Sequence, residues 1–227
     1  MPRGGNKQCA VQYGTGNMVE YKFYYFNGRG LGDVSRQLFA LSGTPYEDVR
    51  VDHAKWMAGD PLKQKMPFGQ MPVLELSNGT MIPQSMAVAR YLARKFGYAG
   101  KTEEEAAMAD ALADQFKDFY GEIKPYYYGK LGAMPTDVEK AKTEVLIPGR
   151  DKFLAILNKF LKESKSGFLL SGGLTYSDLI ISDNMRTLIG WWPEYLDGFP
   201  EVQQWFKKVD SIPEIRKHLD SHPDVGF

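Results

Sequence analysis

The 227-residue chain is 43% hydrophobic and 25% charged, which is the balance of a folded globular protein rather than of a disordered one, and its length allows one or two domains. Its formal net charge of zero at pH 7 lacks the basic excess that phosphate binding requires, which argues against a nucleic-acid partner. No apolar run approaches the roughly 20 residues needed for membrane insertion, and the single cysteine, Cys9, excludes an internal disulfide and fits a reducing, cytoplasmic compartment.

The first half of the chain alternates strands and helices. Residues 1–18 are rich in glycine and asparagine, and we expect a flexible extension that precedes a domain over residues 19–96. The aromatic run "YKFYYF" at 21–26 predicts a strand buried on both faces, and "DVSRQLFALSG" at 33–43 predicts a helix that ends at its glycine. A second strand follows at 46–51, so the three elements predict a βαβ unit with parallel strands.

The rest of this domain is expected to contain a hairpin and a helix. Residues 53–69 show no clear periodicity, and we expect a loop with a short helix. Two short strands flank Asn78-Gly79, the dipeptide that favours a two-residue type I′ hairpin. An amphipathic helix over 86–96 then has Ser85 as its natural N-cap. The order βαβ, loop, ββα is that of a thioredoxin-like domain.

Everything after a linker at 97–101 reads as helix, and we expect an all-helical domain over residues 102–227. Helix starts are indicated by three capping pairs and two first-turn prolines, namely Thr102 with Glu105, Thr136 with Glu139, Thr175 with Asp178, Pro200 and Pro213. The stretch after Thr175 is strongly apolar up to Trp192 and predicts a central buried helix. Pro148 either kinks the second of these helices or starts a new one.

Several motifs, in this order along the chain, are similar to those of a known family. "YYFNGRG" near the start, "MPFGQMPVLEL" and "PQSMAVARYLARKFG" after it, and the capping motif at 175–178 resemble the cytosolic glutathione transferases, above all the nematode members of the sigma class and the haematopoietic prostaglandin D synthases. The resemblance covers about residue 19 to the end. It implies an α/β plus all-α fold, a thioredoxin-like domain followed by a C-terminal helical bundle, and a homodimer that uses glutathione as co-substrate.

The family's reaction needs the glutathione thiol as a thiolate, although a free thiol has a pKa of about 8.5. A hydrogen bond to a charged acceptor contributes about 1.5–3 kcal/mol, which lowers that pKa by about one to two units. The motif match assigns the catalytic hydroxyl to Tyr25 rather than to Tyr24; strand parity sends the two to opposite faces but does not say which face binds the ligand. The plainer alternative for either is a buried aromatic residue. Arg29 matches the family's Arg-Gly pair, which implies a supporting ion pair.

The resemblance also implies a set of glutathione-binding residues. They are Tyr25, Trp56, Lys63, Gln70, Met71, Pro72, Gln84 and Ser85, with Asp118 reaching the glutathione of the partner subunit. In the family, a cis proline at the position of Pro72 leaves the backbone of Met71 free to pair with the tripeptide; the alternative is a trans proline that starts a strand. Gln84-Ser85 matches a pair that holds a carboxylate at a helix N-terminus; the alternative is an ordinary cap. On the plainer interpretation, Trp56 covers the core and Lys63 is solvated.

For the second substrate, alignment to the family points to Tyr126, Ile180, Asn184 and the C-terminal segment as walls of a hydrophobic site. The alternative for the three tyrosines of "PYYYG", which include Tyr126, is a place in the core or in an interface. Leu31 stands where mammalian sigma-class sequences carry an arginine, which weakens the case for prostaglandin isomerisation. Lys117 stands at a position that is acidic in the metal-responsive mammalian protein, so we expect no metal.

The resemblance therefore predicts an enzyme that conjugates glutathione to small hydrophobic electrophiles, with lipid peroxide reduction or prostaglandin isomerisation as further activities of the family. The alternatives are a non-catalytic carrier of the ligandin type and a crystallin-like structural relative. Thiol redox exchange is disfavoured because the chain has no Cys-x-x-Cys motif. The three histidines, His53, His218 and His222, are scattered and predict neither a metal site nor a catalytic triad.

Overall fold

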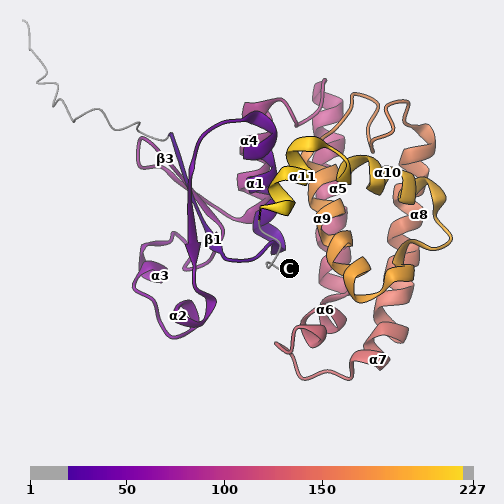
Figure 1. Ribbon diagram of the computed structural model, residues 1–227, viewed down its shortest axis with the longest axis horizontal. Coiled ribbons are helices and arrows are strands. Elements are labelled where there is room, and N and C mark those ends of the chain that lie inside the picture. Colours follow the sequence, from indigo (N-terminus) through magenta and orange to yellow (C-terminus); the bar gives the residue numbers. More distant parts are fainter. Residues whose placement is uncertain (1–19, 222–227) are drawn as a thin grey trace, which may run out of the picture.

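A computed structural model describes residues 20–221, which form an α/β domain and an all-helical domain that lie side by side (Figure 1). The extension expected over residues 1–18 lies outside the described residues. The elements of the first domain are β1 (Tyr21–Phe26), α1 (Asp33–Ser42), β2 (Glu47–Val51), α2 (His53–Met57), α3 (Leu62–Lys65), β3 (Val73–Leu76), β4 (Met81–Pro83) and α4 (Ser85–Phe96). The helical domain contains α5 (Glu103–Glu122), α6 (Lys124–Lys130), α7 (Val138–Ala141), α8 (Ile147–Glu163), α9 (Tyr176–Trp191), α10 (Pro200–Asp210) and α11 (Pro213–Asp220). The predicted fold class is confirmed.

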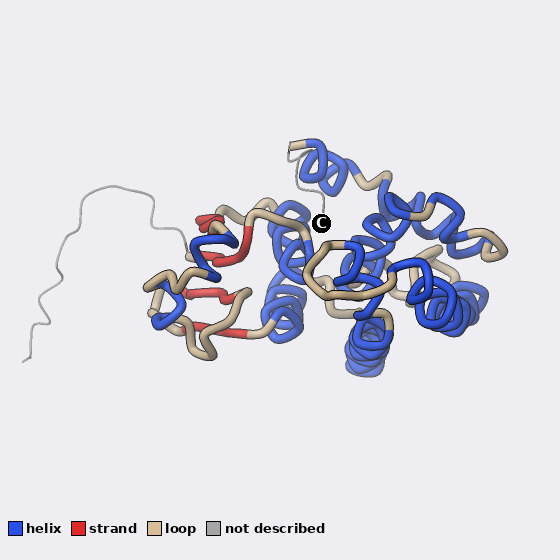
Figure 2. The backbone as a smooth tube through the Cα atoms, turned by 90° about the horizontal axis from the view of Figure 1, so that it is seen from below, coloured by secondary structure: helices blue, strands red, loops and turns tan. Residues whose placement is uncertain are grey.

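The four strands form one mixed sheet in the order β2-β1-β3-β4. β1 runs parallel to β2 and antiparallel to β3, with Tyr24 opposite Val73. α1 and α4 lie between this sheet and the helical domain (Figure 2). Side chains alternate along β1, so Phe23 and Tyr25 pack toward these helices, whereas Tyr24 packs against a small cluster on the opposite face.

The hairpin between β3 and β4 is antiparallel as predicted, but its turn is not type I′. That turn needs positive φ at both central residues, and Gln84 is the only non-glycine residue with positive φ within residues 20–221. The loop instead has three residues and ends at Gly79, which has a φ of 82°. The Asn78 side chain accepts a hydrogen bond from the N–H of Thr80, two residues further along the chain, at 3.0 Å. This Asx-turn stabilises the three-residue loop.

Most helix boundaries follow the predicted signals. α1 ends at Gly43, which adopts the left-handed conformation at φ 65°. Thr175 and Asp178 form the predicted capping box at the start of α9, and Pro200 and Pro213 are the first residues of α10 and α11. Because these signals act within one turn of helix, they are readable from the sequence.

Two predicted helix starts are wrong by one residue. Gln84, not Ser85, occupies the N-cap position of α4, and Ser85 is already the first helical residue. α7 is capped by Asp137, whose carboxylate accepts from the N–H of Lys140 at 3.0 Å, rather than by Thr136. An aspartate accepts this bond at least as well as a threonine, so the chain uses the neighbour that lies closer to the helix.

Pro148 lies near the start of α8, in a helical run that begins at Val138. A single π-helical turn at Lys142–Leu146 separates α7 from α8. Because proline has no N–H, it removes one donor from the hydrogen-bond ladder of a helix. Of the two predicted alternatives, the structure favours the first: the helical run continues without a break from Val138 to Glu163, and the π-helical turn just before Pro148 is a local distortion within it.

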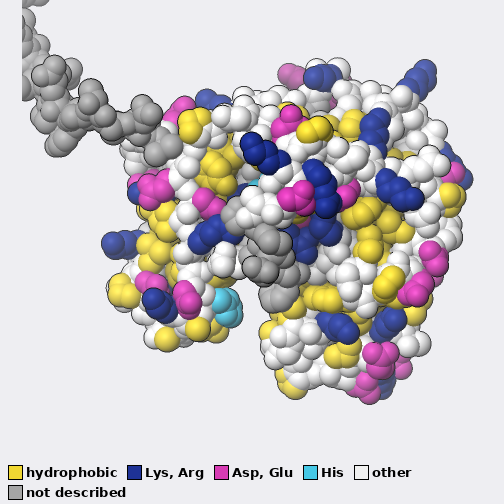
Figure 3. All heavy atoms as spheres, in the orientation of Figure 1, with side chains coloured by type: hydrophobic (Ala, Val, Ile, Leu, Met, Phe, Trp, Pro, Cys, Tyr) yellow, Lys and Arg dark blue, Asp and Glu magenta, His cyan; other side chains and the backbone are white. Residues whose placement is uncertain are grey.

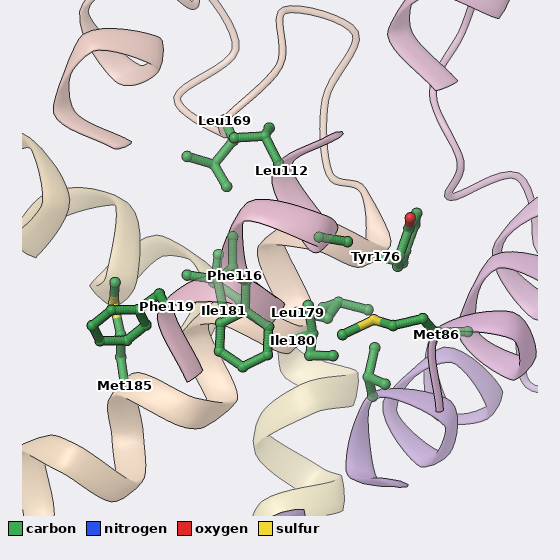
Figure 4. Close-up of a cluster of buried hydrophobic side chains, with 14 of the residues drawn as sticks. Met86, Leu112, Phe116, Phe119, Leu169, Tyr176, Leu179, Ile180, Ile181 and Met185 are labelled. Atoms are coloured by element: carbon green, nitrogen blue, oxygen red, sulfur yellow. The ribbon is translucent and has the colours of Figure 1, made fainter. Parts of the chain in front are cut away.

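An apolar core around α9 joins the two domains. Met86 of α4 lies beside Tyr176 and Ile180 of α9, with Phe116 of α5 next to them (Figure 4). All four side chains are buried. This core fixes α5 relative to the first domain and therefore sets the shape of the cleft between them. Within residues 20–221, no helix combines the length and the apolar character needed to cross a membrane.

Candidate functional site

Tyr25 lies near the end of β1, where the following glycine-rich turn wraps around its ring. The N–H of Leu31 donates to the Tyr25 hydroxyl at 3.2 Å. Gly30 has a φ of 42°, and a Cβ atom there would lie 2.7 Å from the Tyr25 hydroxyl oxygen. A Cβ atom on Gly32 would overlap the ring itself, at Cδ1. The backbone can approach the phenol this closely only because both residues lack a side chain.

We therefore expect Gly32→Ala to lower the free energy of unfolding by about 1–3 kcal/mol, because the Tyr25 ring must be displaced to admit the methyl group. Gly121→Ala is the matched control. It lies in α5 with open space around the position of its Cβ, so the same substitution should stabilise the protein by up to about 1 kcal/mol. Urea denaturation of both variants measures the difference. Equal effects would contradict the close packing of the turn on Tyr25.

The environment of Tyr25 keeps its hydroxyl protonated at neutral pH. Burial raises the pKa of Tyr25 to about 12, against the opposing effects of the Leu31 N–H and the nearby Arg36. The Arg36 guanidinium lies 5.6 Å from the centre of the Tyr25 ring and donates to the carbonyl oxygens of Phe26 and Gly28 at 3.1 and 2.7 Å. Tyr25 is therefore a hydrogen-bond donor next to a fixed positive charge, and sequence reasoning missed Arg36.

The hydroxyl of Tyr24 is hydrogen-bonded on the opposite face of the sheet. Its hydroxyl donates to Glu75 Oε2 at 2.7 Å, across the pair formed by β1 and β3. Burial and this carboxylate raise the pKa of Tyr24. Of the two candidate tyrosines, Tyr25 is the one on the sheet face that meets the helical domain.

The loop before β3 and the start of α4 bring a second group of predicted residues together. The Met71–Pro72 peptide bond is cis, as the resemblance implied. Gln84 Nε2 donates to Gln70 Oε1 at 3.2 Å, which links the two segments. Gln84 itself has a φ of 76°, a conformation that is rare outside glycine. It leaves Ser85 at the exposed N-terminus of α4, where free N–H groups and the helix dipole favour an anion.

A cleft of ≈ 260 Å³ connects this helix start with the turn around Tyr25. The first domain lines it with Leu31, Gln84, Ser85, Met86, Ala87 and Arg90, and α5 lines it with Phe116, Lys117 and Tyr120. The surface is visibly hollowed between the first domain and the lower part of the helical domain (Figure 3). The cleft thus combines apolar walls with a positive helix end.

Trp56 and Lys63 lie together on the outer side of the sheet. Trp56 is buried in the small cluster that also contains Val51, Met66 and Val73. The exposed Lys63 places its Nζ atom 5.6 Å from the centre of the Trp56 ring. Trp56 therefore covers the core, as the plainer interpretation has it, and whether the two residues also bind a ligand stays a prediction.

The side chain of Arg29 extends from the turn after β1 to the helical domain. Its guanidinium lies 3.5 Å from Asp183 Oδ1 and donates to Thr187 Oγ1 at 3.1 Å, both on α9. Gln37 Nε2 donates to the same Asp183 at 3.2 Å and to Asp33 at 3.0 Å. Burial and the neighbouring Asp33 raise the pKa of Asp183 to about 6. This polar network ties the turn that carries Tyr25 to the central helix of the other domain.

The network continues to the last described helix. Nε2 of His218, on α11, lies 3.0 Å from Asp33 Oδ1. Together with hydrogen bonds to Gln37, His218 lowers the pKa of the buried Asp33, against the opposing effect of burial. Sequence reasoning missed Asp33, Gln37 and Asp183 and set His218 aside. The only local signal was a run of polar residues in α1, which the structure buries instead of exposing.

The three residues predicted to bind the second substrate are buried in the helical domain and do not line the cleft. Tyr126, Ile180 and Asn184 are 2%, 3% and 8% exposed, and none of them lines the cleft described above. Asn184 Oδ1 is buried without a hydrogen-bond partner within residues 20–221. Asp118 is exposed on α5, so its predicted contact with a partner subunit stays a prediction. Among the described residues, no group of three or more His, Cys, Asp or Glu side chains is arranged to hold a metal ion.

Comparison with known proteins gives a consistent result over both domains. The family model described as "Glutathione S-transferase, N-terminal domain" matches residues 21–94, and the one described as "Glutathione S-transferase, C-terminal domain" matches residues 117–222. A curated relative from Caenorhabditis elegans, "Probable glutathione S-transferase 5", is 44% identical over 212 residues, which are 92% of this chain and 100% of the relative.

Two solved structures extend the comparison. Monomeric Na-GST-3, a glutathione S-transferase from the hookworm Necator americanus, is 42% identical with a TM-score of 0.87, and the match covers 92% of this chain and 100% of that chain. The rat protein hPGDS, complexed with a quinoline, is 30% identical with a TM-score of 0.79, and the match covers 91% of this chain and 99% of that chain.

Proposed function

This chain belongs to the glutathione S-transferase family and is an enzyme of that type, and from this premise we propose that Tyr25 holds the thiol of bound glutathione as a thiolate that attacks hydrophobic electrophiles. The observation that carries the proposal is the Tyr25 hydroxyl, kept protonated by burial, next to an inter-domain cleft. A phenol whose pKa is about 12 remains a donor while a thiol loses its proton, so the negative charge develops on sulfur.

The same site offers complementary groups to the rest of the tripeptide. We place the γ-glutamyl carboxylate at Gln84 and Ser85, because the start of α4 presents free N–H groups. The cysteinyl backbone pairs with Met71 beside cis Pro72, and Gln70 supports Gln84 from the neighbouring loop. The glycine carboxylate then extends toward Trp56 and Lys63, whose ammonium group is exposed.

We further propose that the protein is a cytoplasmic, sigma-like homodimer in which Asp118 reaches the glutathione of the partner subunit. An open hollow of ≈ 530 Å³ along α4 supports an interface there; Ala87, Arg90, Tyr91, Arg94 and Lys95 line it. Met57 and Phe68 are exposed apolar side chains, at 67% and 62%, of the kind that protein contacts cover. Lipid hydroperoxides are proposed as further substrates, whereas Leu31 argues against efficient prostaglandin isomerisation.

The decisive test is glutathione conjugation to 1-chloro-2,4-dinitrobenzene by the purified full chain, with glutathione binding measured by calorimetry on the same sample. We expect binding and turnover together, and a sedimentation mass of two chains. Binding without turnover would favour the ligandin-type carrier. A protein that neither binds glutathione nor conjugates it would contradict the proposed glutathione site.

A further inference from the structure

A buried contact joins the last described helix, α11, to the first residue of α1. His218 of α11 places its Nε2 atom 3.0 and 3.1 Å from the two carboxylate oxygens of Asp33. Asp33 is 2% exposed, and the His218 side chain is 10% exposed. The helices α11 and α1 pack against each other (Figure 1). The function proposed above uses neither residue.

The Asp33 carboxylate depends on His218 more than on its other partners. A buried carboxylate is costly unless donors or cations surround it. Gln37 Nε2 donates to one oxygen at 3.0 Å, and the Arg36 guanidinium lies 3.9 Å away, nearer to Asp48 at 3.1 Å. Among the described residues, only His218 is within hydrogen-bond distance of both oxygens. Because an ionised carboxylate only accepts hydrogen bonds, Nε2 is the donor. Burial alone would raise the pKa of Asp33, but the contacts with His218 and Gln37 lower it.

Asp33 lies at the end of the turn that wraps the Tyr25 ring. Its N–H donates to the carbonyl oxygen of Arg29 at 3.0 Å, which closes the turn. Two residues before Asp33, the N–H of Leu31 donates to the Tyr25 hydroxyl at 3.2 Å. Because the turn is short and its ends are joined, a displacement of Asp33 moves the Leu31 N–H with it. Holding the Asp33 side chain therefore also holds the hydrogen bond at Tyr25 in place.

The hydrogen bond from Leu31 affects how well Tyr25 donates. A phenol has one proton and accepts through its lone pairs. When the Leu31 N–H occupies a lone pair, the hydroxyl proton is left to point to another acceptor, and a hydroxyl that accepts one hydrogen bond donates a stronger one. A thiolate beside Tyr25 gains from both effects. Loss of the Leu31 contact should therefore weaken the donor and raise the pKa of the bound thiol.

Resting on the proposed function, we propose that His218 is a positioning residue for the activation of glutathione: it holds the Asp33 carboxylate, and through it the turn whose Leu31 N–H binds Tyr25. His218 touches neither substrate and acts only through Asp33. A helix near the end of the chain thereby adjusts a hydroxyl near its start, and the site is complete only when α11 is docked on α1.

The test measures, in the full-length protein, the thiolate band of bound glutathione and its conjugation to 1-chloro-2,4-dinitrobenzene. His218→Phe keeps a ring at this position but removes the donor. It should raise the pKa of the bound thiol by about 0.5 to 1 unit, and each unit is about a factor of ten in thiolate at a pH below the pKa. At pH 6, kcat should therefore fall by about 3- to 10-fold. At about pH 9, where the thiol is mostly ionised in either protein, kcat should fall by less than about twofold.

Matched variants separate this contact from the general packing of α11. His218→Gln restores an Nε2–H donor and should recover most of the thiolate and most of kcat at pH 6. Ile215→Val shortens another buried side chain of the same helix, and it should lower the urea midpoint without moving the pKa of the thiol. In an Asp33→Asn background, His218→Phe should add nothing further, because the carboxylate on which His218 acts is already gone.

Four results would each overturn the inference. They are an unchanged thiol pKa in His218→Phe, an equal rise in Ile215→Val, a loss of kcat that is the same at both pH values, and a His218→Gln protein no better than His218→Phe. If His218→Phe does not fold, His218→Asn decides instead, because its shorter amide does not reach Asp33, and an unchanged thiol pKa again overturns the inference. A wild-type protein that binds no glutathione or shows no thiolate band would overturn the proposed function itself.

Discussion

Replacing Tyr25 with phenylalanine is expected to lower kcat/KM for glutathione conjugation at pH 7 by about 10- to 100-fold. The ring still fills the glycine turn, because the substitution removes only the hydroxyl that accepts from the N–H of Leu31. What is lost is one hydrogen bond to the thiolate, worth about 1.5–3 kcal/mol, and each 1.36 kcal/mol corresponds to about a factor of ten. The fold should therefore survive while the chemistry slows.

The physical reason is tested directly by the pKa of the bound thiol. Ultraviolet difference spectra follow the thiolate band as the pH is raised. In the wild type the thiol should titrate about one to two units below its reference pKa of about 8.5, and in Tyr25→Phe it should return close to that value. An activity loss without this shift would assign Tyr25 a different role.

Tyr24→Phe is the matched neighbour. It removes a hydroxyl from the adjacent residue, whose hydrogen bond goes to Glu75 on the other face of the sheet. We expect the pKa of the bound thiol and the conjugation rate to stay unchanged in this variant. Similar losses in the two variants would mean that the effect belongs to the strand as a whole and not to the hydroxyl that faces the cleft.

The fold and the centre of the site could be predicted because their signals are local. The strand that carries Tyr25, the glycine that ends α1 and the capping box of α9 each depend on residues within a few positions. The same reasoning went wrong where two neighbours compete for one role. Asp137 replaced Thr136 as the cap of α7, and Gln84 replaced Ser85 at the N-cap position of α4.

What could not be predicted depends on contacts between distant parts of the chain. His218 looked isolated in the sequence, yet it binds Asp33, which lies 185 positions earlier. Arg29 was expected to form an ion pair, but the neighbouring residues in the sequence do not identify its partner, Asp183, which lies 154 positions away. The periodicity of a sequence does not predict which polar residues come into contact across a domain boundary. Those contacts depend on how whole helices pack against one another.

The burial of the residues predicted for the second substrate has the same origin. Tyr126 packs against Trp191, and Ile180 lies in the core shared by α4, α5 and α9. Apolar residues at helical spacing satisfy a core and a hydrophobic site equally well, so the sequence alone does not separate the two. Leu31 and Tyr120 line the cleft from different domains, so their roles depend on how the two domains pack and could not be predicted from the sequence.

Asp178→Ala is expected to have the largest effect on stability, a loss of about 3–5 kcal/mol in the free energy of unfolding. The carboxylate is fully buried and accepts hydrogen bonds from the N–H groups of Leu169 and Thr175, both at 2.9 Å, and from Trp205 Nε1 at 2.8 Å. Alanine leaves these three donors buried without an acceptor, and each unsatisfied donor costs about 1–3 kcal/mol. Partial relaxation keeps the sum below the upper limit.

Asp137→Ala provides the comparison, since it removes another aspartate whose carboxylate accepts a backbone hydrogen bond at a helix start. Asp137 is exposed and accepts from a single N–H group, that of Lys140, so its loss should cost about 1 kcal/mol. Urea denaturation of both variants gives the two values. A similar, small loss in both would show that water reaches the donors around Asp178. A large difference would show that this carboxylate holds the loop before α9, the start of α9 and α10 together.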